Sequence, residues 1–136
     1  MTLEVSTDPA RLDVGLIHRW LSEDAYWALG RSREVVERAI EGSLSFGAYD
    51  DGRQVGYARV VTDRATFAWV CDVYVDRAAR GHGVGKALVA AIDATLRGLG
   101  VRRAMLATED AHALYAAVGF APLPDQHRWL LRTYEP

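Results

Sequence analysis

The chain has 136 residues, of which 50% are hydrophobic and 25% are charged, as is usual for one soluble globular domain. Its formal net charge of −2 disfavours a nucleic-acid-binding protein, which would carry a basic surface. A single cysteine, Cys71, excludes an internal disulfide and a metal site built on several cysteines. No apolar run reaches the ~20 residues that span a membrane, and the N-terminus lacks the pattern of a signal peptide. We therefore expect one cytoplasmic domain over residues 1–136, with no metal and no membrane or nucleic-acid partner.

The first half of the chain predicts a short strand, three helices and a β-hairpin. The strand is expected at residues 3–6, and Asp8, followed by a proline, marks the start of the first helix. Ser22 and Ser32 are good N-cap residue types and predict two further helices, the first of which ends near Gly30. The hairpin has two apolar strands joined by Asp-Gly turn chemistry, and its parts are residues 44–49, 50–52 and 54–61.

The second half of the chain alternates strands and helices. Residues 66–75 are almost all apolar and predict a central strand that is covered on both faces. The elements expected after it are a helix at 87–99, a strand at 103–107, a helix at 111–118, an extended segment at 120–123 and a last strand at 128–134. The sum is an α/β (α+β) domain with a mixed sheet, in which an antiparallel meander precedes a β-α-β crossover.

A glycine-rich loop, Arg80-Gly-His-Gly-Val-Gly-Lys86, joins the central strand to the following helix. Its backbone N–H groups stand at a helix N-terminus, where they and the helix dipole favour an anion. Glycine lets the main chain approach a ligand closely or adopt a positive φ, and Arg80 and Lys86 add positive charge. A phosphate or pyrophosphate of a nucleotide-bearing cofactor therefore suits this loop best.

Two common phosphate loops do not fit this stretch. The nucleoside-triphosphate loop would need a glycine in place of Arg80 and a hydroxyl residue in place of Ala87. The dinucleotide fingerprint would need a third glycine in place of Lys86. The spacing that does fit is Arg-x-x-Gly-x-Gly, carried by Arg80, Gly83 and Gly85.

That pattern, preceded by Asp72-Val-Tyr-Val-Asp76, resembles the acetyl-CoA-binding motif of the GNAT N-acetyltransferase superfamily. About thirty residues further on, Ala113-Leu-Tyr-Ala-Ala-Val-Gly-Phe120 is similar to the Leu-Tyr-x-x-x-Gly-Phe segment of that family. The two motifs place the cofactor-binding core at residues 66–123, and the remainder resembles small bacterial-type members. The resemblance implies a single GNAT-like domain, with a mixed sheet of about six to seven strands that is flanked by helices and splays apart where the cofactor enters.

The resemblance also implies which residues bind acetyl-CoA. The backbone of one strand segment would pair with the pantetheine arm like an added strand, and its residues are Val73, Tyr74 and Val75. The loop would hold the pyrophosphate through its amides, at positions Arg80, Gly81, His82, Gly83, Val84, Gly85 and Lys86. Thr108 stands where the family often carries an asparagine that contacts the cofactor arm, and it is also a plausible helix cap.

Acetyl transfer to an amine needs an acceptor for the amine proton and a donor for the departing thiolate. Tyr115 is the expected acid, because the resemblance implies a phenol beside the thioester sulfur. Trp69 and Cys71 occupy the positions where relatives carry a base, and neither is one. Asp72 and His112 are the candidate bases, with a water relay as the third alternative. Asp72 shares a face with residues 69 and 71 only if the strand bulges, and it is otherwise a hydrogen-bonded structural group.

The acceptor site is expected among the N-terminal helices and the hairpin. Its candidate residues are aromatic, namely Tyr26, Trp27 and Trp69, and could hold an apolar or cationic acceptor. Nearby acidic and basic residues leave both cationic and carboxylate-bearing amines open. The leading hypothesis is an N-acetyltransferase that moves the acetyl group of acetyl-CoA to a primary amine of a small molecule or peptide, with a homodimer left open. A catalytically silent acyl-CoA-binding or sensing module and a structural interaction domain are the alternatives.

Overall fold

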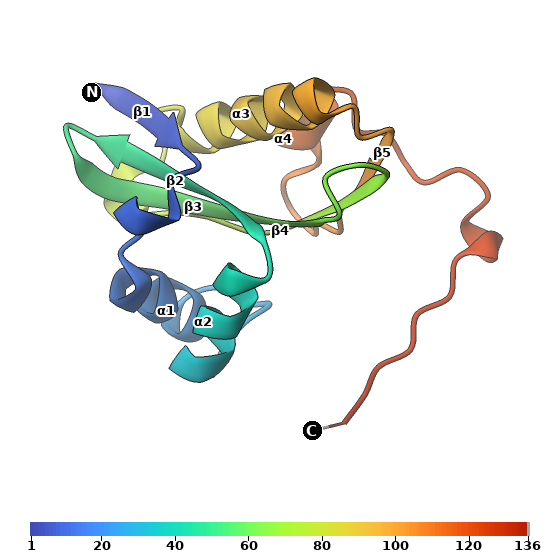
Figure 1. Cartoon of the computed structure of the whole chain (residues 1–136), viewed down its shortest axis with the longest axis horizontal. Coiled ribbons are helices and arrows are strands. Elements are labelled where there is room, and N and C mark those ends of the chain that lie inside the picture. Colours follow the sequence, from blue (N-terminus) through green and yellow to red (C-terminus); the bar gives the residue numbers. More distant parts are fainter. Residues whose placement is uncertain (136) are drawn as a thin grey trace.

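Five strands form one sheet in the computed structural model, which describes residues 1–135 (Figure 1). The strands are β1 (Leu3–Ser6), β2 (Leu44–Asp50), β3 (Arg53–Thr62), β4 (Phe67–Val75) and β5 (Arg103–Met105), and they lie side by side in this order. Each of the first three pairs antiparallel with the next, whereas β5 joins β4 in parallel. The sheet is therefore mixed, and the expected meander precedes the expected crossover.

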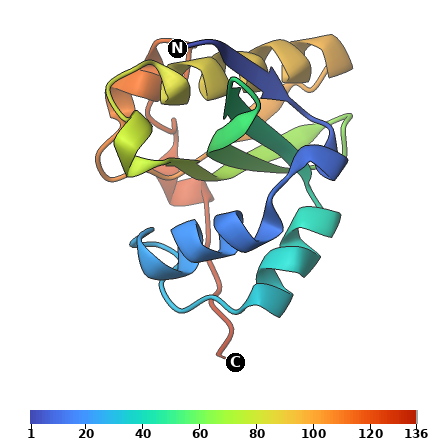
Figure 2. The ribbon, with the colours of Figure 1, turned by 90° about the vertical axis from the view of Figure 1, so that its left-hand side faces the viewer.

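Helices cover both faces of this sheet. They are α1 (Val14–Glu23), α2 (Arg33–Glu41), α3 (Val84–Leu99) and α4 (His112–Ala116), with short 3-10 turns at Pro9–Arg11, Arg77–Ala79 and Gln126–Arg128. α1 and α2 lie on one face and α3 and α4 on the other (Figure 1, Figure 2). None of the helices within residues 1–135 is both long and apolar enough to cross a membrane.

The two faces of the sheet bury separate hydrophobic cores. Under α3, Leu88 and Ile92 pack with Phe46 and Val60 of the sheet. Under α1 and α2, the core includes the members Ile17, Trp20, Leu21, Val36, Tyr57 and Tyr74. Because burial of one large apolar side chain stabilises the fold by ~1.5–3 kcal/mol, each layer holds its own helices onto the sheet.

Several predicted boundaries are confirmed by their local chemistry. Ser32 caps α2, since its Oγ accepts from the N–H of Val35 at 3.2 Å. The hairpin between β2 and β3 turns at Asp51 and Gly52, which have φ values of 49° and 84°. Two consecutive positive φ values are the signature of the tight turn that Asp-Gly sequences favour.

Other expected boundaries are wrong. α1 begins at Val14 after an Asp13 cap, and the region of Asp8 forms only a 3-10 turn. Ser22 does not start a second helix, because its hydroxyl donates to the carbonyl of His18 within α1 at 2.6 Å and residues 24–32 form a connecting loop. α3 begins at Val84, three residues earlier than expected, with Gly83 as its N-cap.

The expected sheet of six to seven strands is also corrected, to five. Residues 120–123 and 129–134 form no strand, and Arg128 ends a 3-10 turn. A strand exists only with a hydrogen-bonded neighbour, and in the described chain the outer edge of β5 pairs with neither segment. The last residues instead run away from the domain (Figure 1).

Candidate active site

β4 and β5 pair over only three residues before they separate. Residues 67–69 of β4 lie opposite residues 103–105 of β5, whereas β4 continues to Val75. On its other side β4 pairs with β3 along most of its length. Within residues 1–135, one backbone edge of residues 70–75 is therefore left without a strand partner. An extended ligand can add to such an edge as a further strand would.

A β-bulge in β4 changes which residues of its second half face each side of the sheet. The register with β3 shifts there, and Asp72 has a positive φ of 51°. Ala68 and Val70, before the bulge, belong to the core under α3, whereas Tyr74, after it, belongs to the core under α1 and α2. Asp72 therefore faces the α1–α2 side, as Trp69 does by alternation with its neighbours. The strand thus has the bulge that Asp72 needs in order to share a face with Trp69.

The Asp72 carboxylate is buried and accepts three side-chain hydrogen bonds. The indole Nε1 of Trp27 donates to Oδ1, and the guanidinium groups of Arg31 and Arg59 donate to Oδ2, each at 2.8 Å. Burial alone would raise the pKa of this carboxyl, but the hydrogen bond from Arg59 and the charges of Arg59 and Arg31 outweigh it and lower the pKa. A carboxylate held by two cations is a weak proton acceptor. This geometry favours the structural role for Asp72.

The same contacts fix the loop between α1 and α2 against the sheet. Trp27 and Arg31 both belong to this loop, so their hydrogen bonds to Asp72 tie it to the β4 bulge. Tyr26 stands edge-on to Trp27, with ring centroids 5.0 Å apart. Tyr26, Trp27 and Trp69 keep 51%, 41% and 37% of their surfaces exposed. The candidate acceptor residues are thus surface aromatic groups on one side of the sheet.

Tyr115 lies in α4 and is almost completely buried, with its ring edge-on to Phe120 at 6.0 Å between centroids. Burial raises the pKa of its phenol, and the charges of Asp110 and Tyr26 raise it further. The phenol is therefore protonated at neutral pH and can donate.

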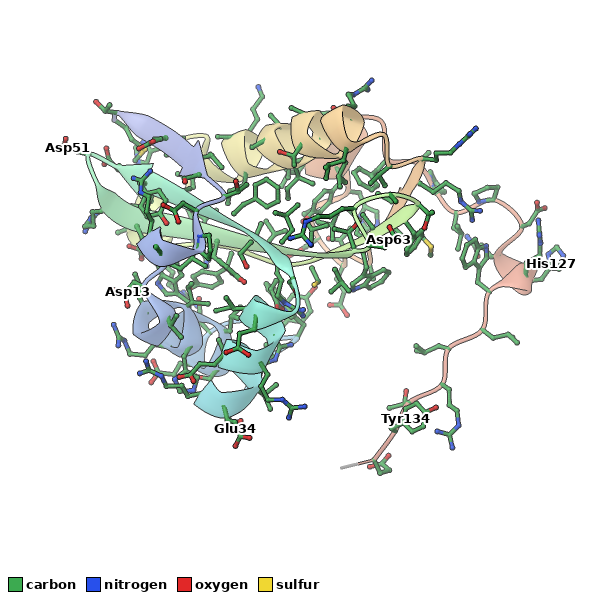
Figure 3. All side chains as sticks on the ribbon, in the orientation of Figure 1. Asp13, Glu34, Asp51, Asp63, His127 and Tyr134 are labelled. Carbon is green, nitrogen blue, oxygen red and sulfur yellow. The ribbon has the colours of Figure 1, made fainter. Side chains whose placement is uncertain are left out.

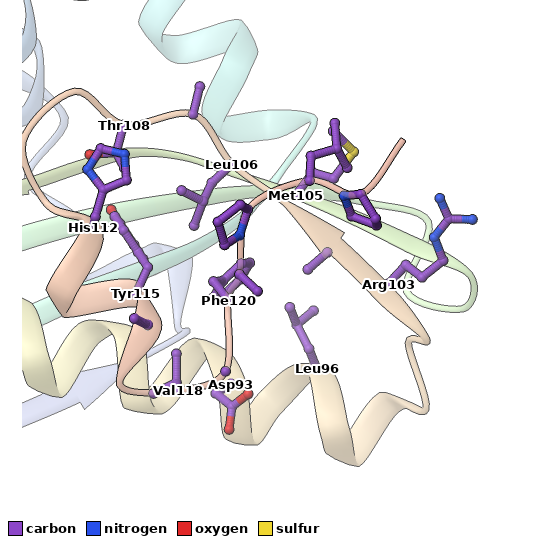
Figure 4. Close-up of a pocket in the computed structure, with 18 of the residues that line it drawn as sticks. Asp93, Leu96, Arg103, Met105, Leu106, Thr108, His112, Tyr115, Val118 and Phe120 are labelled. Atoms are coloured by element: carbon purple, nitrogen blue, oxygen red, sulfur yellow. The ribbon is translucent and has the colours of Figure 1, made fainter. Parts of the chain in front are cut away.

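His112 and Thr108 line the same groove as Tyr115 (Figure 4). The side chain of His112 is exposed at the start of α4. Thr108 uses its hydroxyl as a local cap, because Oγ1 accepts from the N–H of Ala111 at 3.0 Å. The groove has a volume of about 1120 Å³ and is bounded by α3, β5, α4 and residues 118–129.

The glycine loop has the open backbone that a phosphate group requires. Gly81 and Gly83 have φ values of 83° and 84°, in the left-handed region, and apart from their chain neighbours no described residue comes within 4 Å of the place where a Cβ would stand at either. No side chain of residues 1–135 caps the N-terminus of α3, which has 16 residues. The N–H groups of its first turn are therefore left for a ligand, and the loop fits the pyrophosphate of CoA.

Arg80 is directed away from this loop. Its Nε donates to the carbonyl of Val75 at 3.0 Å, its guanidinium lies 5.2 Å from the ring centroid of Tyr74, and it pairs with Asp24 at 3.3 Å. Asp24 also accepts from Arg77 and Tyr74, and these two hydrogen bonds lower the pKa of its carboxyl. No spacing in the sequence indicated this cluster, whose members lie about fifty residues apart. Both expected cations are exposed, but only Lys86 forms no ion pair with another residue of 1–135.

The thiol of Cys71 is not an activated nucleophile. Burial raises the pKa of Cys71 to about 11, so it is neutral at physiological pH. Residues 1–135 also contain no group of three or more His, Cys, Asp or Glu side chains placed to hold a metal ion.

Comparison with known proteins identifies the family. The model of the acetyltransferase (GNAT) family matches residues 15–120, which include both sequence motifs. The chain belongs to the GNAT family. The match also spans the β4–β5 opening, the glycine loop and Tyr115.

Individual relatives agree with this assignment. A protein from Xanthomonas campestris pv. campestris that is assigned to the GNAT family is 49% identical in sequence to this chain. Its crystal structure gives a TM-score of 0.90, and the match covers 100% of this chain and 95% of that chain. A Gibberella zeae protein assigned as an acetyltransferase is 32% identical over 65% of this chain, but the alignment spans only 61% of that protein. N-acetylglutamate synthase from Neisseria gonorrhoeae, solved with coenzyme A and N-acetyl-glutamate, shares the fold at 23% identity and a TM-score of 0.71, over 94% of this chain and 31% of that chain.

The Asp72 cluster makes a testable contribution to the stability of this GNAT domain. In Asp72→Asn, two largely buried guanidinium groups lose their carboxylate, so we expect the free energy of unfolding at pH 7 to fall by about 3 kcal/mol. Because folding lowers the pKa of Asp72, its contribution is complete above the ordinary carboxyl pKa of ~3.9 and is lost as the pH falls through the folded value. Urea unfolding should therefore show a difference between wild type and variant that shrinks below about pH 4.

The matched control is Glu37→Gln, which removes the carboxylate of an exposed pair between Arg33 and Glu37 on α2. This change should alter stability little. Equal effects of the two substitutions at pH 7 would contradict the structural role of Asp72.

Proposed function

We propose that this GNAT protein is an N-acetyltransferase that moves the acetyl group of acetyl-CoA to a primary amine of a small molecule or peptide. The proposal depends on one observation, the opening between β4 and β5 with Tyr115 facing the groove beside β5. A free backbone edge leads from the glycine loop towards this opening. The arrangement suits a long ligand with a phosphate at one end and a reacting group at the other.

The residues present fit acetyl-CoA, which supplies an acetyl group already activated as a thioester. The backbone of residues 73–75 is proposed to hydrogen-bond the amide-rich arm, as the unpaired edge of β4 allows. The amides of residues 81–86 are proposed to hold the pyrophosphate, with Lys86 as the nearby cation. Thr108 lines the same groove as Tyr115, so it remains a candidate contact for the arm.

Tyr115 is proposed as the general acid. Its raised pKa keeps the phenolic proton in place at neutral pH, so the hydroxyl can donate to the sulfur that leaves. The amine must lose a proton, since unperturbed lysine-like amines have a pKa near ~10.4. Asp72 is held by three donors and is poorly suited to accept it. His112, exposed on the same groove, or a water molecule is the proposed acceptor of this proton.

The acceptor is proposed to lie against Tyr26, Trp27 and Trp69. Arg31 and Arg59 both donate to Asp72, whose single negative charge balances only one of their two positive charges. The exposed aromatic faces suit an amine carried on an apolar or cationic molecule, and the remaining positive charge keeps a carboxylate-bearing amine open as well. The cytoplasmic location and the lack of a membrane or nucleic-acid partner stay predictions from composition.

A second candidate is a catalytically silent acyl-CoA-binding module. It is favoured by one specific observation, namely that Trp69 and Cys71 stand where a base would be expected and that Asp72 is already paired. This candidate predicts binding of acetyl-CoA without turnover of any amine.

The role of Tyr115 can be tested with Tyr115→Phe. Loss of the proton donor should lower kcat by about 10²-fold, with little change in the affinity for CoA, when release of free thiol is followed across a panel of amines. Because the pKa of Tyr115 is raised above its usual ~10, its ionisation should not reduce the wild-type rate between pH 7 and pH 10.

Tyr49→Phe is the matched control, since the buried Tyr49 hydroxyl on β2 has no hydrogen-bond partner among residues 1–135 and its removal should leave kcat unchanged. Full activity of Tyr115→Phe would remove the proposed acid. A wild-type protein that binds acetyl-CoA but acetylates no amine would support the silent module instead.

The cofactor site can be tested with Gly83→Glu. A side chain there meets a strained φ of 84° and places a negative charge at the proposed pyrophosphate site, so calorimetry should show that CoA binding is lost. Gly52→Glu is a close control, because Gly52 has the same φ and the same open surroundings but lies at the hairpin turn. Retained affinity in Gly83→Glu, or equal loss in both variants, would contradict the assignment of the loop.

A further inference from the structure

Two stretches of backbone line the groove that Tyr115 faces without pairing with each other. One is β5 with its continuation, residues 103–107, and the other is residues 119–124. Both line the same groove, together with apolar side chains of α3 such as Ile92 and Leu96 (Figure 4). In the described part of the chain, β5 pairs only with β4, and no ladder joins residues 119–124 to any strand. Each stretch therefore presents unpaired backbone groups to the groove.

The sequence of residues 120–124 suits an edge strand that pairs on one side. Pro122 and Pro124 have no N–H, and they alternate with Ala121 and Leu123, which do. In an extended chain, alternate residues direct their N–H and C=O groups to opposite edges. The edge that carries the two prolines has no N–H donors and therefore suits the outside of a sheet. The other edge keeps its donors and can pair with a strand.

The segment that follows, residues 129–135, is an apolar extended chain that no surface of the domain covers. Leu130, Leu131 and Tyr134 are 96%, 92% and 78% exposed. Residues 129–135 make no strand pairing, and they run away from the domain as far as the labelled Tyr134 (Figure 3). The sequence nevertheless predicts a strand there, from its aromatic and aliphatic content. A long unpaired strand with exposed leucines is a surface that proteins ordinarily cover.

The chain does not fold this segment back into its own groove. A 3-10 turn at Gln126–Arg128 follows Asp125, whose positive φ of 52° redirects the backbone. Trp129 then packs against Arg103 at the start of β5, with the guanidinium 5.4 Å from a ring centroid. Beyond Trp129 the backbone leaves the sheet (Figure 1).

We propose that residues 129–135 of one copy of this chain form a strand in the groove between β5 and residues 119–124 of a second copy. Seven residues span ~23 Å and the five residues 103–107 span ~16 Å, so the segment is long enough to cover the groove. The exchange would be reciprocal about a two-fold axis, and it would bury Leu130 and Leu131 in each copy. Because Tyr115 and His112 line this groove, the partner's segment completes the wall of the active site.

The first test is the mass of the full-length protein in solution, measured by sedimentation from sub-micromolar to millimolar concentration. The wild type should be a dimer, and the double variant Leu130→Asp with Leu131→Asp should be a monomer. The control is Leu99→Asp, because Leu99 is also exposed, at the end of α3, but does not line the groove, and this variant should remain a dimer. A monomeric wild type across this range would overturn the proposal.

The second test asks whose groove the segment occupies. A photoreactive benzoylphenylalanine replaces Leu131, and heavy- and light-isotope chains are mixed and irradiated. Exchange predicts cross-links between heavy and light peptides that join position 131 to residues 103–107 or 119–124. Cross-links to these residues within single chains, or dimers cross-linked elsewhere, would contradict the exchange. Neither test depends on acetyl transfer, so the exchange can fail while the proposed function stands.

Discussion

The buried carboxylate of Asp72 is the contact on which the arrangement of the site depends. A carboxylate in an apolar strand is costly unless it is fully paired, and here an indole and two guanidinium groups complete its hydrogen bonding. The bulge at Asp72 directs the residues before and after it to different cores. A bulge also interrupts the hydrogen-bond ladder and increases the local twist, which agrees with the end of β4–β5 pairing at Trp69. One strained residue thus accounts for both the opening in the sheet and the position of the acceptor loop.

Two ionic clusters connect the N-terminal helices to the cofactor-binding half of the domain. Asp72 binds Arg31 from the α1–α2 loop, and Asp24 at the end of α1 binds Arg77 and Arg80 from the segment before α3. In the first cluster the carboxylate belongs to the sheet and an arginine to the helical side. In the second cluster the carboxylate belongs to the helical side. Both clusters join a helical or loop segment to another part of the chain with which it forms no strand pairing. The proposed cofactor and acceptor surfaces are thereby held in a fixed relation across the sheet.

Local chemistry explains which features could be predicted from the sequence. The hairpin turn, the Ser32 cap and the glycine turn ahead of a helix each depend on residues within a few positions of one another, and the structure confirms these backbone features. The Asp72 cluster depends on contacts between residues 41 and 45 positions apart, for which a single sequence carries no spacing signal. Its bulge requires a positive φ at an aspartate, which composition does not indicate. The strand expected at 128–134 was wrong for a related reason, since strand propensity does not supply a neighbouring strand.

The most direct test of the account is hydrogen exchange of the backbone amides with and without CoA. If the unpaired edge of β4 and the start of α3 hold the cofactor, CoA should slow exchange in residues 70–75 and 81–86. Exchange in the β2–β3 hairpin should not change. Protection confined to other segments, or no protection at a saturating concentration of CoA, would contradict the account.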